Sequence, residues 1–239
     1  MNLFPKHGLF SAPPPKATLW RYMHLAKFLS LLARRGLFFS GLAHLEDAFE
    51  GRYTNATVSK YPVFATDFAP GNSVAVNCWC RSPRESAMHW NAFCAGGSGI
   101  AIVSSRSRLQ SAIRGTSYLR KSSLFVGRIR YLDYSRHLHV PPEGYPVNVL
   151  APVITKRAQF RSENEVRLVL WSLDCSFCAT IEQHGGVYVP VDLGELFGAV
   201  VCGPGTPNWA VDDVRQLLRR YRLDPGLVRR SEVDAYPSY

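Results

Sequence analysis

Lysine is scarce in this sequence. Only six of the 28 basic residues are lysines, so arginine supplies most of a formal net charge of +10. Uninterrupted basic runs are absent as well, and the positive charge is spread along the chain. Positive charge can attract a nucleic acid, an anionic membrane surface or a phosphate-rich cofactor. A dispersed arginine content favours none of these partners over a general compositional bias.

Long apolar runs are also absent. No stretch approaches the roughly 18–20 apolar residues that a membrane-spanning helix needs, and the beginning of the chain lacks the apolar segment of a signal peptide. We therefore expect a cytoplasmic protein that does not associate with a membrane. Apolar residues nevertheless make up 46% of the chain and charged residues 19%, which is typical of a globular protein with a sizeable core.

Cysteines are few for a chain of this length, with six in 239 residues, and a secreted disulfide scaffold is not expected. Cys78-x-Cys80 and Cys175-x-x-Cys178 supply enough thiolates for a zinc site. However, Cys78 and Cys80 lie two residues apart in a strand-like run and would share one face, which is poor geometry for chelation. We expect reduced, mostly buried thiols and no bound metal.

The order of apolar and polar segments predicts one α+β domain after a tail. Residues 1–16 contain four prolines and little apolar surface, which indicates a disordered tail. Residues 17–239 show neither a repeat nor a linker, and we expect a single domain with a mixed, mostly antiparallel sheet flanked by helices. Apolar runs and alternation predict strands at 17–23, 37–39, 74–80, 99–103, 125–131, 165–171 and 186–193. Apolar residues at helical spacing predict helices over 24–35, with a stripe of Leu25, Phe28, Leu29 and Leu32, and over 147–159.

The end of the chain predicts a strand–helix–strand unit. Its first strand is Ala199–Cys202, and its helix runs to about Tyr221, with Thr206 as the N-cap and Pro207 at the first helical position. A second strand at 228–233 would close the unit. The intervening Gly203-Pro-Gly lacks the spacing of a dinucleotide fingerprint or a P-loop, and we interpret it as a tight turn.

Four segments occur in a characteristic order after residue 17. They are Leu19-Trp-Arg-Tyr-Met followed by a helix and Gly36-Leu-Phe-Phe-Ser-Gly; Glu46-Asp-Ala-Phe-Glu-Gly; Cys78-Trp-Cys with Met88-His-Trp-Asn and Gly97-Ser-Gly-Ile-Ala-Ile; and Lys156-x-x-x-Phe160-x-x-Glu163-x-Glu165-x-Arg167. In this order they resemble a bacterial family known as domain of unknown function 2971, which has Asn and Pro where this chain has Glu46 and Ala48. The resemblance implies kinship and brings no reaction with it.

Glu163-x-Glu165 is the sharpest candidate for a catalytic motif. It stands at the start of the predicted strand 165–171, where alternation would place both carboxylates on one face. One carboxylate could stabilise a cationic transition state while the other orients or deprotonates an attacking group. Glu-x-Glu-Val before an apolar strand also resembles the active-site strand of arginine-type ADP-ribosyltransferases.

That second resemblance implies an NAD-dependent transferase. Glu165 would assist the departure of nicotinamide and Glu163 would engage the acceptor, while Arg21 would bind the phosphates of NAD, a task that suits a bidentate guanidinium. The chain departs from the pattern on a middle strand, where those enzymes carry Ser-Thr-Ser. Either Ser40 or Ser82 would have to substitute for it.

The same glutamates have an alternative, structural interpretation. Glu163 and Glu165 could pair with Lys156, Arg157 or Arg167 at the surface, where such ion pairs contribute only ~0–1 kcal/mol.

Two other groups are candidate site residues. Asp47 and Glu50 could line a cleft or bind a metal with His44; alternatively, Asp47 bonds its own backbone in a turn and Phe49 fills the core. Metal binding is not favoured, because hard cations need more oxygen ligands than this run supplies. Trp90, which precedes a glycine-rich stretch at 96–99, could stack on a nicotinamide or a base, or could be a core residue.

Three functions are compatible with these patterns. The preferred one is an NAD-dependent ADP-ribosyltransferase-like enzyme that modifies a protein or a nucleic acid, with the positive charge mildly favouring the latter. The second is a non-catalytic binding or regulatory module in bacterial stress or phage defence. The third is a metal-assisted phosphodiesterase that uses Asp47, Glu50 and the glutamate pair. Neither the substrate nor the oligomeric state follows from the sequence.

Overall fold

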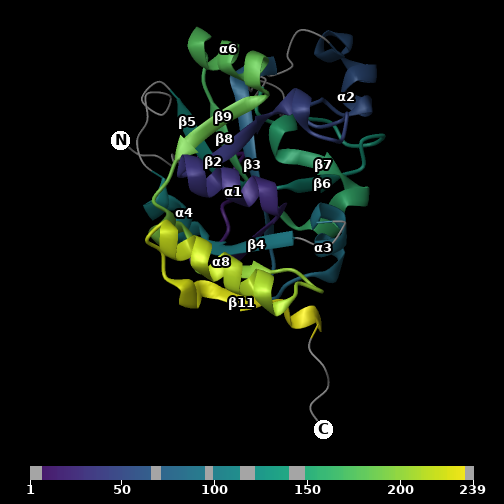
Figure 1. Ribbon diagram of the computed structural model, residues 1–239. Coiled ribbons are helices and arrows are strands. Elements are labelled where there is room, and N and C mark those ends of the chain that lie inside the picture. The colour runs from purple at the N-terminus through teal and green to yellow at the C-terminus, as the bar shows by residue number, and fades with distance from the viewer. Residues whose placement is uncertain (1–6, 66–70, 95–98, 114–121, 140–148, 235–239) are drawn as a thin grey trace. The chain divides into compact units, whose positions relative to one another are not determined.

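A computed structural model gives the structure of this chain and describes residues 7–65, 71–94, 99–113, 122–139 and 149–234. The fold is α+β with a mixed, mostly antiparallel sheet, as the sequence predicts (Figure 1). The chain divides into two compact units. Unit 1 comprises Met1–Pro13, Phe38–Cys78 and Gly115–Val187, and unit 2 comprises Pro14–Leu37, Trp79–Arg114 and Tyr188–Tyr239.

Three strands contribute residues to both units, because the chain passes between them within β2, β3 and β9. These strands are β2 (Gly36–Gly41), β3 (Val74–Arg81) and β9 (Gly186–Pro190).

Unit 1 contains the central strand β8 (Glu165–Trp171), which is buried along most of its length. It pairs with β3 and, antiparallel, with β5 (Ser123–Arg128). The short strands β6 (Arg130–Leu132) and β7 (Thr155–Arg157) form a separate parallel pair. The remaining elements are η1 (Leu42–His44), α2 (Asn55–Lys60), η2 (Pro62–Ala65), η3 (Gly71–Ser73), η4 (Pro152–Ile154), η5 (Ala158–Glu163) and α6 (Cys175–His184).

The core of unit 1 lies against the apolar residues of β3, β5 and β8. It gathers Val74, Val76, Phe125, Val169, Leu42, Leu150 and Val153. Residues 7–16 belong to the stretch predicted as a tail, yet the Phe10 ring stacks on Phe125 at 4.7 Å and the Ser11 carbonyl accepts from the Arg128 amide. The Phe10 side chain therefore anchors a segment that the proline content had suggested would be disordered.

Unit 2 contains a sheet in the order β11–β10–β4–β1–β3. Its long antiparallel pair runs from Thr18↔Ser105 to His24↔Gly99. The strands are β1 (Thr18–His24), β4 (Gly99–Ser105), β10 (Ala199–Cys202) and β11 (Val228–Arg230), with the end of β3 beside β1. The helices are α1 (Leu25–Arg34), α3 (Ala87–Cys94), α4 (Arg106–Ala112), α7 (Leu193–Leu196) and α8 (Asn208–Arg220), with the 3-10 turns η6 (Pro225–Leu227) and η7 (Glu232–Asp234).

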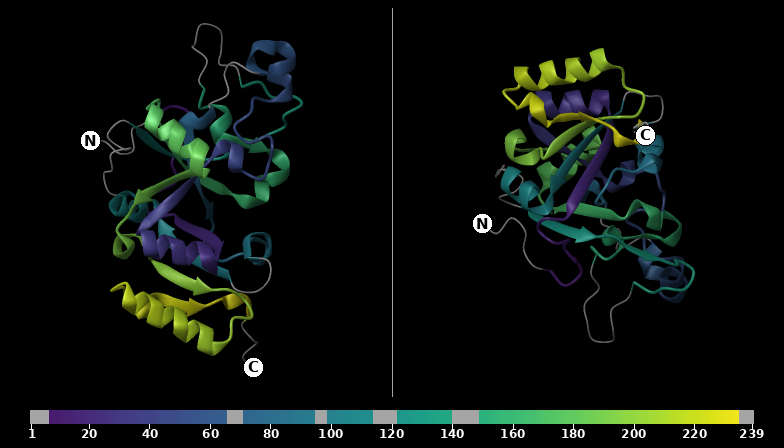
Figure 2. Two further views of the ribbon diagram at one scale, coloured as in Figure 1. Left: turned by 45° about the horizontal axis from the view of Figure 1, so that its top comes forward. Right: turned by 90° about the horizontal axis from the view of Figure 1, so that it is seen from below.

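The predicted C-terminal strand–helix–strand unit is confirmed. β10 and β11 pair in parallel, from Val200↔Val228 to Cys202↔Arg230, with α8 between them in the sequence. Figure 2 shows α8 beside β11 at the yellow end of the chain. The helix begins one residue later than predicted, because Pro207 is the N-cap and the Thr206 hydroxyl donates to the Gly203 carbonyl. β11 ends at Arg230, so the second strand is shorter than predicted.

The buried face of α1 is rotated from the predicted stripe. Phe28, Leu31 and Leu32 are buried, whereas Leu25 and Leu29 are 36% and 42% exposed. The helix ends at Arg34, and its C-cap, Arg35, adopts the left-handed conformation (φ 46°).

Three other predicted elements differ from the structure. The strand at 125–131 breaks at Ile129 into β5 and β6. Within the predicted helix 147–159, residues 149–159 instead form η4, β7 and the start of η5, because Pro152 prevents continuous helical hydrogen bonding; residues 147 and 148 lie outside the described part. The predicted strand 186–193 ends at Pro190, and Asp192 caps α7.

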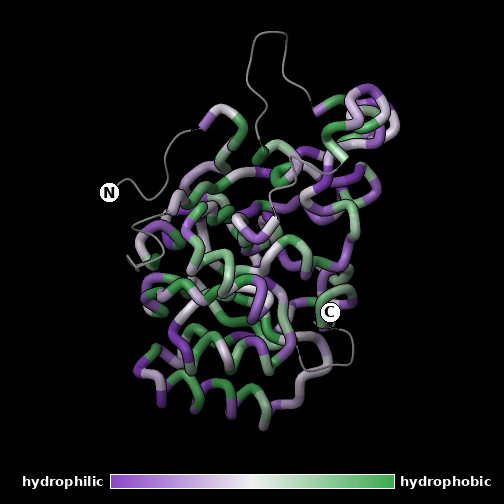
Figure 3. Tube along the Cα trace, turned by 90° about the horizontal axis from the view of Figure 1, so that it is seen from above, coloured by the Kyte–Doolittle hydropathy of each residue, from purple (hydrophilic) through white to green (hydrophobic). Residues whose placement is uncertain are grey.

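Short apolar and polar segments alternate along the chain (Figure 3). Among the described residues, no helix is long and apolar enough to cross a membrane.

Candidate functional site

The Glu163-x-Glu165 motif lies in unit 1, but not on one strand face. Glu163 is the last residue of η5, and β8 begins at Glu165. Between them Asn164 adopts the left-handed conformation (φ 43°), which asparagine tolerates better than most residues. The expected strand alternation is therefore wrong. The two carboxylates converge because the backbone turns at Asn164, and they meet at the side chain of Lys156.

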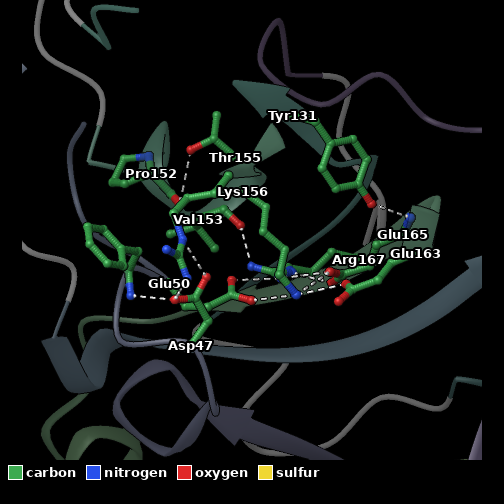
Figure 4. A network of polar contacts seen from close by, with 12 residues as sticks. Asp47, Glu50, Tyr131, Pro152, Val153, Thr155, Lys156, Glu163, Glu165 and Arg167 are labelled. Atoms are coloured by element: carbon green, nitrogen blue, oxygen red, sulfur yellow. Dashed lines mark hydrogen bonds and ion pairs between the residues drawn. The ribbon is translucent and has the colours of Figure 1, made fainter. Parts of the chain in front are cut away.

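Lys156, from β7, is the centre of the site. Its Nζ lies 2.7 Å from Glu163 Oε2, 3.0 Å from Glu50 Oε1 and 3.8 Å from Glu165 Oε2. The ammonium also lies 4.6 Å from the ring centroid of Phe160. Only 10% of the lysine side chain is exposed, so three carboxylates surround a nearly buried cation (Figure 4).

Arg167, from β8, is the second buried cation, with a side chain that is 0% exposed. Its Nε and Nη2 donate to the two oxygens of Glu165, at 2.7 and 3.0 Å. Nη2 also lies 2.9 Å from Glu50 Oε2, and Nη1 donates to the Val153 carbonyl at 2.8 Å. Every nitrogen of this guanidinium therefore has an acceptor, which a buried arginine requires.

The Glu46–Gly51 segment supplies the third carboxylate. Glu50 is 4% exposed and bridges the two cations, with one oxygen on Lys156 and the other on Arg167. Asp47 accepts from the backbone N of Phe49 at 3.1 Å, as expected for the turn, and pairs with Arg157 at 2.9 Å. Phe49 is half-buried rather than a core residue, and the Arg157 guanidinium lies 4.3 Å from its ring centroid.

The glutamates thus pair with Lys156 and Arg167, as the structural alternative proposed, but the pairs are buried rather than exposed. Glu165 is 5% exposed and Glu163 is 22% exposed. Burial changes the energetics, since removing one member of a buried pair leaves the other charged and unpaired.

The environment moves the pKa values of these groups in different directions. Burial raises the pKa of Glu163, and the hydrogen bond from Lys156 does not fully offset it. Burial also acts to raise the pKa of Glu165, but Arg167 and Lys156 lower it below its usual value. Burial opposes the charge of Lys156 and of Arg167, yet the surrounding glutamates raise the pKa of both cations.

The charges of the cluster do not cancel. Glu50, Glu163 and Glu165 carry three negative charges against two positive charges on Lys156 and Arg167, while Asp47 and Arg157 balance each other. Glu163 is the most exposed of the three carboxylates, so it forms the accessible edge of this negatively charged cluster.

Several supporting residues were not predicted as site residues. The Tyr131 hydroxyl accepts from the Glu165 amide at 2.8 Å. Thr155, next to Lys156, contacts His139 Nε2 at 2.8 Å, and His139 Nδ1 accepts from the Thr54 amide at 3.1 Å. Cys78 forms a side-chain hydrogen bond with Glu165, and burial raises the pKa of its thiol. Lys156 could have been found from the sequence, because it lies seven residues before Glu163. The contacts of Tyr131 and His139 join residues far apart in the chain, and no sequence pattern predicts them.

Other predicted residues lie outside this cluster. Ser40 is on β2, where its hydroxyl donates to the Gly41 carbonyl at 3.3 Å. Arg21 and Trp90 belong to unit 2. Arg21 is half-buried on β1, and Ser82 accepts from the Arg84 amide. Their proposed contacts with NAD stay predictions.

Trp90 is packed in the core of unit 2. It is 3% exposed, lies edge-on against Tyr22, and donates from Nε1 to Glu85 at 2.8 Å. This is the core position that the alternative interpretation assigned to it. Residues 96–98 of the glycine-rich stretch lie outside the described part of the chain.

Within the described ranges, no group of three or more His, Cys, Asp and Glu side chains is arranged to hold a metal ion. In the glutamate cluster the Lys156 ammonium already occupies the point where the three carboxylates converge. The six cysteines are free; Cys175 is exposed, so burial is not common to all of them.

Comparisons with known proteins identify no family for this chain and a distantly similar solved structure. No family model matches this chain, so the resemblance to domain of unknown function 2971 has no support from that comparison. No curated protein matches either. Among solved structures, DarT from Thermus sp. 2.9 in complex with NAD+ shares 10% identity, with a TM-score of 0.40, over 95% of this chain and 100% of that one. A likeness of this size carries no inference about the site.

Proposed function

We propose that this chain is an ADP-ribosyltransferase-like enzyme that consumes NAD, with its reacting carboxylates in the Lys156 cluster. The observation that carries the proposal is a cluster with three carboxylates and two cations, in which Glu163 is the most exposed carboxylate. Transfer of ADP-ribose passes through a ribosyl cation, and fixed negative charge in a site that is shielded from water stabilises such a cation.

The two motif glutamates suit different tasks. Glu165 is ionised and held by Arg167, so its position and its ionised state are set before positive charge develops on the ribose. Glu163 is more exposed, and burial raises its pKa, which brings a carboxylate closer to the range of an effective general base. Glu163 therefore suits contact with the acceptor.

The proposed step balances without a redox partner. The glycosidic bond between C1′ of the ribose and the nicotinamide nitrogen breaks, and neutral nicotinamide leaves with the bonding pair. An acceptor oxygen or nitrogen forms the new bond to C1′, and its proton goes to Glu163. The acceptor is a protein or a nucleic acid.

The residues of the cluster fit the ribosyl cation better than the phosphates of NAD. Both buried cations are already engaged by carboxylates, so neither is available to a diphosphate. The diphosphate therefore needs a cationic group outside the cluster, and Arg21 is the residue that the sequence resemblance nominates for this role.

Release of nicotinamide tests the chemistry. The protein would be incubated with NAD, with and without protein and nucleic-acid acceptors, and nicotinamide followed by chromatography. Glu165→Gln should reduce release at least about 100-fold, a typical loss when one preorganised electrostatic group is removed. Glu182→Gln, an exposed change on α6, is the matched control and should retain full release. Release that persists in folded Glu165→Gln would contradict the assignment.

Binding of NAD is tested separately. A ligand that binds only the native state raises the thermal midpoint by mass action, so millimolar NAD should raise it in the wild type and not in Arg21→Ala. No rise in the wild type would reject the proposed function.

A non-catalytic binding module is the second candidate. The observation that favours it is the engagement of both Glu165 oxygens by a fully buried arginine, an arrangement that a purely structural cluster would also show. This candidate predicts no nicotinamide release with any acceptor and a large loss of stability in Glu165→Gln.

A further inference from the structure

The contact between Lys156 and Glu163 differs from the others in the cluster. Glu165 and Glu50 each contact both cations, whereas the cation that contacts Glu163 among the described groups is Lys156, at 2.7 Å. The lysine is itself restrained, because Glu50 lies 3.0 Å from Nζ and the ring of Phe160 lies beneath it. The Lys156 ammonium thus contacts both the more accessible carboxylate, Glu163, and a buried carboxylate, Glu50.

We propose that Lys156 is a positioning residue that keeps Glu163 oriented and ionised. Glu50 weakens this effect, because it binds the same ammonium. Lys156 and Glu50 would then act as a pair that sets the pH range over which Glu163 accepts a proton. The role in catalysis rests on the proposed function, whereas the effect on Glu163 itself does not.

The groups that face Glu163 come from four parts of unit 1. Lys156 on β7 favours its charged form, while Glu165 on β8 and Glu50 in the segment after η1 disfavour it. Tyr131 on β6 interacts with both Glu163 and Glu165, and burial raises its pKa, so it stays neutral over the range in which a carboxylate titrates. Burial raises the pKa of Glu163 most, and the charges of one cation and two anions adjust it further.

Changing the two members of the pair should have opposite effects. Glu50→Gln removes a negative charge and frees Lys156 for Glu163, so Glu163 should ionise at lower pH. Lys156→Met removes the only stabilising charge that faces Glu163 among the groups described, so Glu163 should ionise at higher pH. A charge within about 4–6 Å typically changes the ratio of ionised to protonated carboxyl by on the order of tenfold or more at a fixed pH.

The direct test follows Glu163 by NMR. Protein with ¹³C-labelled glutamate would be titrated, and the Glu163 side-chain signal assigned by its disappearance in Glu163→Gln. Lys156→Arg keeps the charge and should leave the midpoint close to that of the wild type. Glu182→Gln, on the exposed surface of α6, removes a distant carboxylate and should leave it unchanged.

Stability does not decide the outcome. Lys156→Met leaves Glu163 without its cation, and Glu50 and Glu165 with Arg167 alone, which can prevent folding. Glu50→Gln instead lowers the net negative charge of the cluster, so this variant alone suffices for the test. A lower Glu163 midpoint in folded Glu50→Gln supports the proposal. An unchanged or higher midpoint overturns it.

The kinetic test separates this inference from the proposed function. With Glu163 as general base, the acidic limb of nicotinamide release should move to lower pH in Glu50→Gln and to higher pH in Lys156→Met. A moved NMR midpoint with no nicotinamide release in any variant would reject the proposed function and retain the inference. Nicotinamide release together with an unchanged NMR midpoint would retain the proposed function and reject the inference.

Discussion

The guanidinium of Arg167 donates to both carboxylate oxygens of Glu165, two residues earlier on the same strand, at 2.7 and 3.0 Å. Strand alternation places these two residues on one face of β8, and burial makes the pair dependent on both members. The cost of removing two charges from water is offset only while each retains its partner. Arg167 also contacts Glu50, so its loss would leave two carboxylates without their main cation.

Arg167→Met should therefore destabilise the protein by about 3–5 kcal/mol, as expected when one partner of a buried ion pair is removed. Urea unfolding followed by circular dichroism measures the change. Arg136→Met is the matched control, because Arg136 is highly exposed and its pair with Asp133 lies at the surface; it should cost less than about 1 kcal/mol. Similar losses in the two variants would contradict a special role for the buried pair.

His139 should make the protein less stable in mild acid. Its Nδ1 accepts from the Thr54 amide, so Nε2 carries the proton and donates to Thr155. Burial, aided by Arg130, lowers the pKa of His139 to about 4. The native state therefore favours the neutral ring, and stability is lost as the pH falls from the unfolded value of about 6.5 towards 4.

The expected loss from His139 between pH 7.5 and pH 5 is about 2 kcal/mol. His139→Asn should be less stable than the wild type at pH 7.5 and should show a smaller loss on acidification. The comparison between the two proteins is needed because the raised pKa of Glu163 acts in the opposite direction, favouring the native state at lower pH. Equal pH dependence in both proteins would exclude His139 as the cause.

Much of the fold follows from short-range patterns. The segments 165–171 and 199–202 predict β8 and β10 to the residue, because both strands are buried along most of their length. β10 carries no charged residue, and the two charged residues of β8, Glu165 and Arg167, pair with each other. The helix α8 also follows from its spacing, with Val211, Val214 and Leu218 buried. Apolar patterns of this kind predict which residues are buried, and these segments are buried in the fold.

The prediction of 147–159 as a helix fails for an instructive reason. Apolar residues at helical spacing are present, but Val153 and Ile154 are buried as parts of a 3-10 turn before β7. Packing into the core of unit 1, rather than helix formation, buries them. The spacing alone cannot distinguish these two causes.

The candidate site was only partly predictable. Two separate segments of the sequence pointed to Glu50 and to Glu163, Glu165 and Arg167, and these residues do converge. It did not reveal that Lys156 would be central, since a lysine among charged residues is usually exposed. Convergence depends on the left-handed turn at Asn164 and on contacts more than a hundred residues apart in the chain, such as Glu50 with Lys156. No local pattern encodes these.

Gly186→Ala tests a close approach of two segments in unit 1. A Cβ at this position would collide with the Phe39 carbonyl oxygen, a backbone atom, and with the ring of Phe38. Because the backbone atom cannot rotate away, the substitution should cost about 1–3 kcal/mol or more. Gly8→Ala is the control, since nothing lies within 4 Å of its Cβ position, and it should be nearly neutral. Thermal denaturation of the two variants gives the comparison, and a neutral Gly186→Ala would show that β2 and β9 are further apart than the structure has them.

The thiols should react in an order set by exposure. Cys175 is the exposed first residue of α6, whereas Cys80, Cys94 and Cys202 are buried, and burial raises the pKa of Cys202 to about 11. Since the thiolate is the reacting species, native protein at pH 8 should give one fast equivalent with a small aromatic disulfide. The half-buried thiols should be slower, by about tenfold or more, because burial also raises the pKa of Cys78 and Cys178. Cys175→Ser should abolish the fast equivalent while unfolded protein still yields the other five thiols. A fast equivalent that persists in Cys175→Ser would place an accessible thiolate elsewhere and contradict the burial of the remaining cysteines.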